Sequence, residues 1–348
     1  STPLYSSAAS DVYKRQGKHS HKNGFMNNGN SFNWNQQTFP KILRKAGYTT
    51  ALYGKSHLKG NPKGFDDWKV LPGQGDYYNP DLITPKGRVR IDGHCTDVVT
   101  DLAVEWLKTG RDKTKPFMLM VQHKAPHRNW MPALRHLPLY DDVKIPEPTT
   151  LFDKWEDNAP PARHQELEID RHMDINYDLF LDLTADYEGT PSQKRQDRSA
   201  WRNMKKMTKD QLSSWRAFYG PRDKAFHEAN LSGKELVRWK FQRYAKNYLR
   251  CVRGVDDSVG KIVEGLKDIG KYENTIIAFL SDNGCAGYIG NACSNGQLAG
   301  FKRYHQEGGI RIPYILSWPE GFQGNRTIEA PVISFDLMAT FTAAAGNS

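Results

Sequence analysis

Between Thr275 and Pro313 the chain reads TIIAFLSDNGCAGYIGNACSNGQLAGFKRYHQEGGIRIP. The apolar run Ile276–Leu280 is short and begins with β-branched residues, a pattern that predicts a buried strand of a parallel sheet. The run stops at a polar turn that opens with Ser281 and Asp282. Because open α/β sheets place their sites beyond the carboxyl ends of their strands, the stretch predicts an α/β fold with a candidate site at this turn.

The turn offers oxygen ligands for a metal ion. Asp282 and Asn283 supply a carboxylate and an amide side by side, and Gly284 follows them. Such hard oxygen donors suit Ca²⁺ or Mg²⁺. A plainer interpretation is an Asp/Asn-Gly turn that only ends the strand. Lys302 lies twenty residues after Asp282, and the segment EGGIRIP then leads into a second predicted strand, Tyr314–Trp318.

The composition is that of a globular protein with an excess of basic residues. The 348 residues suffice for one large α/β core, or for one core with a sizeable insertion. Lys and Arg number 49 against 39 Asp and Glu, a formal net charge of +10 that favours anionic partners such as nucleic acid or sulfated glycan. Basic residues alternate with acidic ones and no nucleic-acid-binding motif is found, which argues against nucleic acid. No apolar run approaches the roughly eighteen residues of a membrane span.

The four cysteines leave the redox compartment open. None of Cys95, Cys251, Cys285 and Cys293 belongs to a C-x-x-C pair, so a zinc site is not predicted. A disulfide between Cys285 and Cys293 across their loop is one interpretation, and free buried thiols are the other.

A pair of cationic and titratable residues follows the predicted strand Thr49–Tyr53. Lys55 and His57 are two positions apart, and side chains at i and i+2 of extended backbone point to the same side. Both are therefore expected to reach one anion. The alternative is a solvated lysine beside a surface histidine.

A larger cluster, QHKAPHR, follows the predicted strand Phe117–Val121. It contains His123, His127 and Arg128. Such a cationic, titratable group at a strand end suits the donation of a proton to a leaving alkoxide. An ordinary basic loop is the alternative.

Helical periods separate the strands, and a polar insertion interrupts them. Apolar spacing predicts helices over Thr38–Gly47, Thr96–Leu107, Glu235–Ile269 and Ser334–Ala345. From about 141 to 233, prolines and many charges predict a partly helical insertion packed over the sheet, to which no chemistry is assigned. The expected architecture is a mostly parallel sheet with helices on both faces.

Taken in order, GKSH, HKAPH, SDNG and EGGIRIP resemble the motifs of the sulfatase family, in the alkaline-phosphatase superfamily. The resemblance covers about Gly17–Gly346 and implies an alkaline-phosphatase-like fold. It also implies that Asp282 and Asn283 bind calcium. In the same setting His123 and Arg128 become candidate substrate-binding residues.

The resemblance gives roles to the remaining cationic residues. GKSHLKG is similar to the family's GKWHLG, with Ser56 in place of Trp. Lys55 is then expected to bind the sulfate and a formylglycine side chain, and His57 to contact the formylglycine hydroxyl. Lys302 matches the lysine that holds a sulfate oxygen. His127 matches the histidine that protonates the leaving group.

The N-terminal residues 1–16 differ from the rest of the chain. They show neither a signal-sequence pattern nor a helical or strand period. In sulfatases the nucleophile belongs to (C/S)-x-P-x-R, where Cys or Ser is oxidised to formylglycine; Ser1 and Pro3 match, but Tyr5 stands where Arg is expected. We therefore expect a sulfatase-like α/β domain over 17–348 that lacks the nucleophile, the paired aspartates upstream of it and the small C-terminal subdomain, and that is inactive as written.

The function implied by the resemblance is sulfuric ester hydrolysis. The substrate would be a sulfated carbohydrate or an aryl sulfate, the metal calcium, and the location periplasmic or secreted. One alternative is a phosphodiesterase or phosphonate hydrolase of the same superfamily. The other is a non-catalytic protein that binds anionic glycans, which the missing nucleophile favours. The sugar, the sulfate position and the oligomeric state are not predicted.

Overall fold

The computed structural model describes residues 15–346 except positions 28, 155, 157–167, 184–185, 187, 189, 197, 286–294 and 303. Its strands are β1 (Thr49–Gly54), β2 (Asp67–Val70), β3 (Asp81–Thr84), β4 (Gly87–Arg90), β5 (Phe117–Gln122), β6 (Ile277–Leu280) and β7 (Tyr314–Ser317). Its helices are α2 (Ser20–Asn23), α3 (Phe39–Lys45), α4 (Cys95–Glu105), α6 (Ile169–His172), α7 (Pro191–Gln196), α8 (Arg198–Lys206), α9 (Lys209–Ala229), α10 (Gly233–Asp268), α11 (Glu307–Ile310) and α12 (Asp336–Ala344), with a π-helical turn at Trp106–Gly110 and a 3₁₀ turn at Leu134–His136.

Strand β1 lies in the interior of the larger sheet, whose strand order is β4-β3-β2-β1-β5. It pairs in parallel with both β2 and β5. Its apolar residues are covered from both faces, and Leu52 is 0% exposed. Because β1 and β5 run in the same direction, their carboxyl ends meet at one edge of the sheet.

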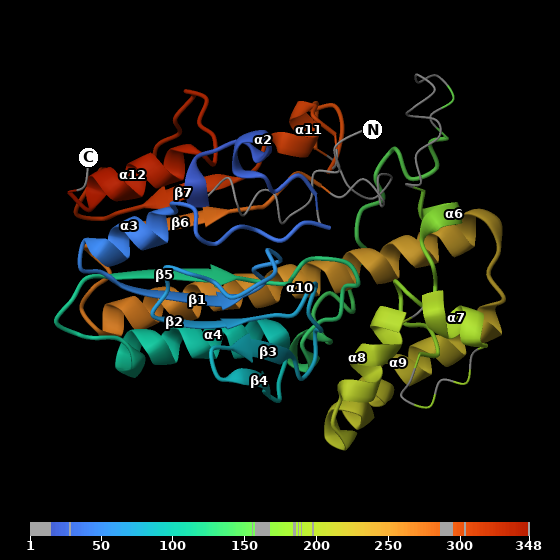
Figure 1. Cartoon of the computed structure of the whole chain (residues 1–348). Helices are drawn as coiled ribbons and strands as arrows, with labels where there is room; N and C mark the ends of the chain where they lie inside the picture. The colour runs from blue at the N-terminus through green and yellow to red at the C-terminus, as the bar shows by residue number, and fades with distance from the viewer. Residues whose placement is uncertain are drawn as a thin grey trace.

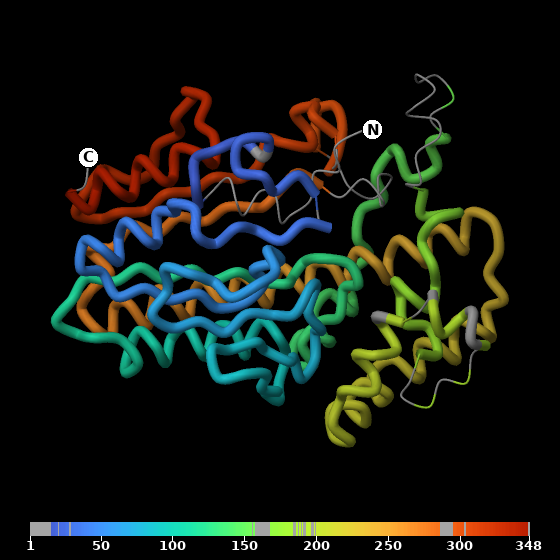
Figure 2. The backbone as a smooth tube through the Cα atoms, viewed as in Figure 1, coloured from blue at the N-terminus to red at the C-terminus, as the bar shows by residue number. Residues whose placement is uncertain are grey.

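Helices cover both faces of this sheet (Figure 1). Helices α4 and α10 pack against each other on one face, and α3 packs on the other. The ring of Phe39 in α3 contacts that of Phe341 in α12 at a centroid distance of 5.4 Å. Figure 2 shows the blue segment that contains α3 beside the red segment that contains α12, on the same face.

The segment expected as an insertion contains α6 to α9. Residues of α6, α8, α9 and α10 contribute to a hydrophobic cluster that includes Phe180, Trp215 and Tyr219. Not all of its charges are solvated: Arg243 Nη1 of α10 lies 2.6 Å from a carboxylate oxygen of Asp223 in α9, and both side chains are largely buried. Figure 1 places these helices at one end of the molecule, beyond the carboxyl ends of β1 and β5.

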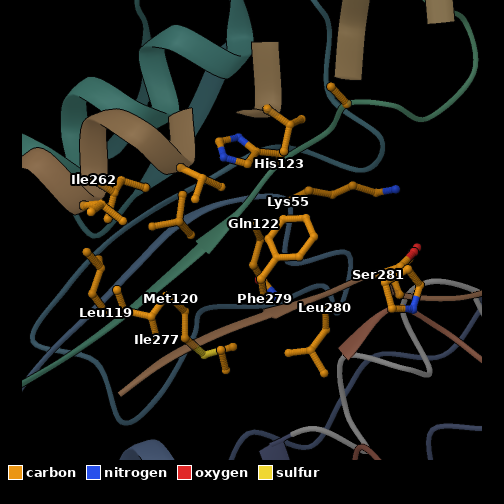
Figure 3. A pocket seen from close by; sticks show the side chains of 18 of the residues that line it. Lys55, Leu119, Met120, Gln122, His123, Ile262, Ile277, Phe279, Leu280 and Ser281 are labelled. Carbon is orange, nitrogen blue, oxygen red and sulfur yellow. The ribbon is translucent and has the colours of Figure 1, made fainter. Parts of the chain in front are cut away.

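Strands β6 and β7 form a separate two-stranded sheet. None of the four residues of β6 is buried, and Phe279 is 41% exposed. A cavity of about 1880 Å³ lies between this pair and the edge strand β5. Apolar side chains from β5, α10 and β6 line it, among them Leu119, Met120, Ile262, Ile277 and Phe279 (Figure 3).

The α/β class and the helices on both faces are confirmed, whereas the expected mostly parallel arrangement is wrong for the strands described. Only the pairs β1–β2 and β1–β5 are parallel; β2–β3, β3–β4 and β6–β7 are antiparallel. The physical reason is connectivity, because no crossover helix separates β2 from β3 or β3 from β4, and a parallel return needs one.

Two further findings bear on the protein's setting. Of the helices that the structure describes, none combines the length and the apolar character needed to cross a membrane. Cys95 and Cys251 are free and buried, and Cys285 is disulfide-bonded. Cys293, its candidate partner, falls outside the described residues.

Candidate functional site

The predicted site residues line one cavity, at the carboxyl ends of β1, β5 and β6. The lining includes Lys55, His57, His123, His127, Arg128, Asp282, Asn283 and Lys302. Figure 3 shows Lys55, Gln122 and His123 near the end of β5, with Ser281 beyond the end of β6. Residues spread over most of the sequence therefore meet where the strand ends predicted that they would.

A glycine allows Lys55 to leave β1 toward the cavity. Gly54 has a φ of +103°, and a Cβ at this position would lie 2.0 Å from the carbonyl oxygen of Gln122. Only glycine fits so close to the neighbouring strand. The amide of Lys55 then donates to that carbonyl at 2.7 Å.

The backbone at His57 differs from the prediction. His57 has a φ of +52°, so the segment is left-handed there and not extended. The reason given for Lys55 and His57 pointing to the same side is therefore wrong, because the chain turns after Gly54. Both side chains nevertheless line the cavity.

The two candidate catalytic histidines lie in a positively charged setting. Burial and the nearby charges of Lys55 and Lys302 lower the pKa of His57 to about 4. Burial and the charges of Lys55, Lys124 and Lys302 lower the pKa of His127 to about 2. Each imidazole is therefore neutral at pH 7 in this structure. An anion in the cavity would offset the lysine charges and raise both pKa values.

The ring of His127 has a defined orientation. Its Nδ1 lies 2.7 Å from the carbonyl oxygen of Arg128, and because a carbonyl only accepts, Nδ1 carries the proton of the neutral ring. The other nitrogen, Nε2, is then the one that can exchange a proton with a bound molecule. This arrangement suits an acid–base residue.

His123 and Arg128 are held by the surrounding scaffold. His123 Nε2 lies 2.9 Å from the hydroxyl of Ser258 in α10. Arg128 donates from Nε and Nη2 to the two carboxylate oxygens of the buried Asp178, each at 2.5 Å, and its guanidinium lies over the Tyr177 ring. These contacts assign both residues to the wall of the cavity, and substrate binding by them stays a prediction.

The two family-like segments SDNG and EGG pack directly against each other. Gly284 N donates to the carbonyl of Gly309 at 3.0 Å, and a Cβ on Gly284 would lie 1.9 Å from the carbonyl oxygen of Gly308. Side chains at these glycines would push the segments apart. The amide of Lys302 donates to Cys285 O at 2.7 Å, which fixes Lys302 beside the same turn.

The expected metal site has suitable donors but few of them. Asn283 Nδ2 is buried without a hydrogen-bond partner among the described residues, and the amide can equally present its oxygen there. With the carboxylate of Asp282 this gives two oxygen donors, whereas calcium takes about six to eight. In the part of the chain that the structure describes, no group of three or more His, Cys, Asp or Glu is placed to hold a metal. Asp282 and Asn283 thus fit a hard cation as part of a ligand set.

Sequence reasoning gave no role to three residues that contact the site. Lys124 appeared only within the cationic segment QHKAPHR, and no prediction named Gln74 or Tyr77. Gln74 Nε2 lies 3.3 Å from His57 Nε2, and the Tyr77 hydroxyl donates to the His127 carbonyl at 2.7 Å. The two glycines that flank Gln74 were the available signal, because a tight loop beside a strand end often carries site contacts.

Comparison with known proteins identifies the family. Residues 13–347 match the family model described as Sulfatase. N-acetylglucosamine-6-O-sulfatase of Bacteroides thetaiotaomicron is 39% identical over 333 residues, which are 95% of this chain and 57% of that protein. Human N-acetylglucosamine-6-sulfatase is 26% identical over 356 residues, or 95% of this chain and 51% of that protein. The chain therefore spans little more than half the length of these relatives.

Solved structures give the same result. The structure of BT4656 in complex with its substrate D-glucosamine-2-N,6-O-disulfate has a TM-score of 0.86 at 36% identity, covering 100% of this chain and 68% of that one. The phosphonate monoester hydrolase SpPMH from Silicibacter pomeroyi has a TM-score of 0.55 at 16% identity, covers 100% and 65%, and shares the fold. Proteins of the matched family generally bind a divalent metal. Because the family model covers nearly the whole sequence, the chain belongs to the sulfatase family.

Proposed function

We propose that the chain is part of an enzyme that hydrolyses sulfate esters of carbohydrates, with 6-O-sulfated glucosamine as the preferred substrate class. The bacterial sulfatase and the BT4656 complex concern such sugars, and each shares over a third of its aligned residues with this chain. The observation that carries the proposal is the shared cavity. Two lysines and two neutral histidines line it beside Asp282 and Asn283.

The lysines supply the binding of the sulfate. Lys55 and Lys302 both act electrostatically on His57 and His127, so their charges reach the same space. A sulfate ester placed there gains from both cations. The charge that develops on the sulfate oxygens as the ester bond breaks would be stabilised by the same two residues, which are already in position.

His127 supplies the proton for the sugar oxygen. Its pKa of about 2 keeps it neutral, and the lysines are the main cause after burial. The negative charge of a bound sulfate would raise this pKa, so substrate binding itself favours protonation of Nε2. The proton then passes to the departing sugar oxygen while the sulfur–oxygen bond breaks.

Two groups complete the proposed site. Asp282 and Asn283 would hold calcium, which supplies positive charge to the sulfate. Formylglycine, whose C/S-x-P-x-R motif is not found intact in the printed sequence, would supply the nucleophile, with His57 as its hydrogen-bonding partner. We also propose a periplasmic or secreted location. The disulfide at Cys285 supports it because such bonds persist in oxidising compartments.

The test compares two proteins on 6-O-sulfated N-acetylglucosamine. One is Ser1–Ser348, and the other is extended upstream by an acidic pair and C-x-P-S-R and is co-expressed with the maturation enzyme. We expect sulfate release by the extended protein and negligible release by the printed chain. In the extended protein, His127→Ala should lower turnover by about 10²–10⁴-fold, the usual share of a general acid.

The other outcomes separate the alternatives. Equal turnover by both proteins would place the nucleophile within the printed residues and end the formylglycine proposal. Binding of inorganic sulfate with no turnover by either protein would favour a protein that only binds anionic glycans. Faster hydrolysis of phosphate diesters or phosphonate esters would assign the chain to another activity of the superfamily.

A further inference from the structure

The loop Leu71–Pro80, between β2 and β3, contacts the segment that carries His57. Leu71 N donates to the carbonyl of Gly54 at 2.9 Å. Gln74 Nε2 lies 3.3 Å from His57 Nε2. With the amide nitrogen of Gln74 at this place His57 Nε2 accepts and the neutral ring has its proton on Nδ1, and with the amide reversed Nε2 donates to Oε1. In either orientation of the amide, the contact with Gln74 favours one tautomer of His57 over the other.

The same loop contacts His127 through Tyr77. This tyrosine is 1% exposed, and its hydroxyl donates to the His127 carbonyl at 2.7 Å. Its backbone is fixed at both ends: Tyr77 N donates to Asn203 Oδ1 at 2.5 Å, and Cys95 N donates to Tyr77 O at 2.7 Å. The backbone of Tyr77 is thus anchored to α8 and α4.

Lys124 connects the two contacts. Its side chain is buried, its Nζ donates to the carbonyl of Gln74 at 3.2 Å, and the same Nζ lies 4.7 Å from the centroid of the Tyr77 ring. A buried ammonium is stable only with such partners. One cation therefore holds the backbone of Gln74 and the ring of Tyr77 together.

The loop is anchored to the insertion by ion pairs. The buried Asp76 accepts from Arg202 at 2.6 Å and from Lys206 at 2.7 Å, both on α8. Helix α8 lies in the segment to which the sequence gave no chemistry. Through Asp76 and Tyr77 it fixes a loop that reaches the site.

From these contacts we propose that Gln74, Tyr77 and Lys124 are positioning residues that set the orientation and separation of His57 and His127. The inference rests on the proposed function, because positioning matters for catalysis only if the two histidines are acid–base groups. Such groups lose much of their effect when they are misplaced by about 1 Å. It concerns residues that would not touch the reacting atoms. Their effect would pass through the two imidazoles.

Two adjacent tyrosines provide a matched pair for the test. Tyr77 and Tyr78 are each 1% exposed, and Tyr78 also donates its hydroxyl to a backbone carbonyl, that of Pro132, at 2.6 Å. Tyr77→Phe and Tyr78→Phe each remove a hydroxyl that donates to a backbone carbonyl, and the Tyr77 hydroxyl also contacts the Cys251 thiol. Only the first removes a contact to a site histidine.

The readouts are the ¹⁵N chemical shifts of the imidazoles and the affinity for inorganic sulfate, both measured on Ser1–Ser348. We expect Tyr77→Phe to shift the His127 nitrogens. We expect Gln74→Leu, which keeps the side chain's size, to mix the tautomers of His57. Each should weaken sulfate binding by about three- to tenfold, the effect of one hydrogen bond. Tyr78→Phe should lower the urea midpoint as much as Tyr77→Phe and leave the histidine shifts and sulfate affinity unchanged.

Equal histidine shifts in Tyr77→Phe and Tyr78→Phe would overturn the proposal, because they would indicate a general loosening. Unchanged shifts in both Gln74→Leu and Tyr77→Phe would overturn it as well. Failure of the proposed function would give a different result from failure of this inference. The extended protein would release no sulfate from the sugar ester, while Gln74→Leu and Tyr77→Phe would still change the histidine shifts of Ser1–Ser348.

Discussion

Strands β1 and β6 have similar apolar sequences and both end in candidate site residues, yet their surroundings differ. Strand β1 lies between β2 and β5, and five of its six residues are buried. Strand β6 pairs with β7, its side chains face a large cavity, and none of its residues is buried. Burial of an apolar run is therefore decided by its neighbours. The site joins a tightly packed half to a loosely packed one.

The largest expected effect is a difference between two leucine truncations. Leu52 of β1 is 0% exposed, whereas Leu280 of β6 is partly exposed. Leu52→Ala should lower the free energy of unfolding by about 3–5 kcal/mol, because it opens a cavity in a closed core. Leu280→Ala should cost less than about 2 kcal/mol, since its methyl groups already face open space. Urea unfolding of the two variants and the parent measures both.

Equal losses of unfolding free energy in Leu52→Ala and Leu280→Ala would contradict the contrast between β1 and β6. They would mean that β6 is as well covered in solution as β1. Leu52→Met provides the control, since it nearly conserves the volume and should cost less than about 1.5 kcal/mol.

Lowering the pH should lower the free energy of unfolding through His123, which lies in the tightly packed half of the molecule. Burial lowers the pKa of His123 to about 4, below its ordinary value of 6.5. Above pH 6.5 the ring is neutral in both the folded and the unfolded chain, so its contribution is fully present. As the pH falls from 6.5 toward 4 the unfolded chain takes up a proton that the folded chain does not, and stability is lost. At pH 5 this loss is about 2 kcal/mol.

The measurement is the free energy of unfolding at pH 7 and pH 5 for the parent and for His123→Gln. The variant can be less stable at both values, but its loss between them should be smaller than the parent's by about 2 kcal/mol. The same acid-induced loss in both proteins would exclude His123 as its source. Buried His94, whose pKa is also lowered to about 4, should then be replaced in the same way.

Much of the fold was predictable because its signals are local. The strands Thr49–Tyr53 and Phe117–Val121 were each predicted to within one residue, since a short apolar run with a glycine or polar end is typical of a buried strand. The convergence of Lys55, His127 and Asp282 followed from their places after strands. Motifs resembling a known family gave the roles.

The features of the fold and site that were not predicted depend on contacts between distant residues, and such contacts produce no periodic pattern in the sequence. Arg128 pairs with Asp178, fifty positions later, and Gln74 contacts His57 across a turn. Neither partner has a motif that points to the other. Strands β2, β3 and β4 were not predicted. The antiparallel direction of β7 was missed because strand direction is set by the connections, and the apolar runs do not encode it.

The smallest expected effect concerns an ion pair within the family-like segment EGGIRIP. Arg311 Nη1 lies 3.2 Å from a carboxylate oxygen of Glu307, one helical turn away, and the two side chains are 68% and 63% exposed. Water screens such a pair and both side chains lose freedom to form it, so Glu307→Gln should change the free energy of unfolding by no more than about 0.5 kcal/mol. Urea unfolding at low and at high salt measures this, and the small effect should vanish at about 1 M salt. A loss above about 1 kcal/mol that persists in salt would show that the carboxylate has a buried partner in solution. The β6–β7 half would then be more tightly packed than its exposed strands indicate, and the contrast with β1 would have to be given up.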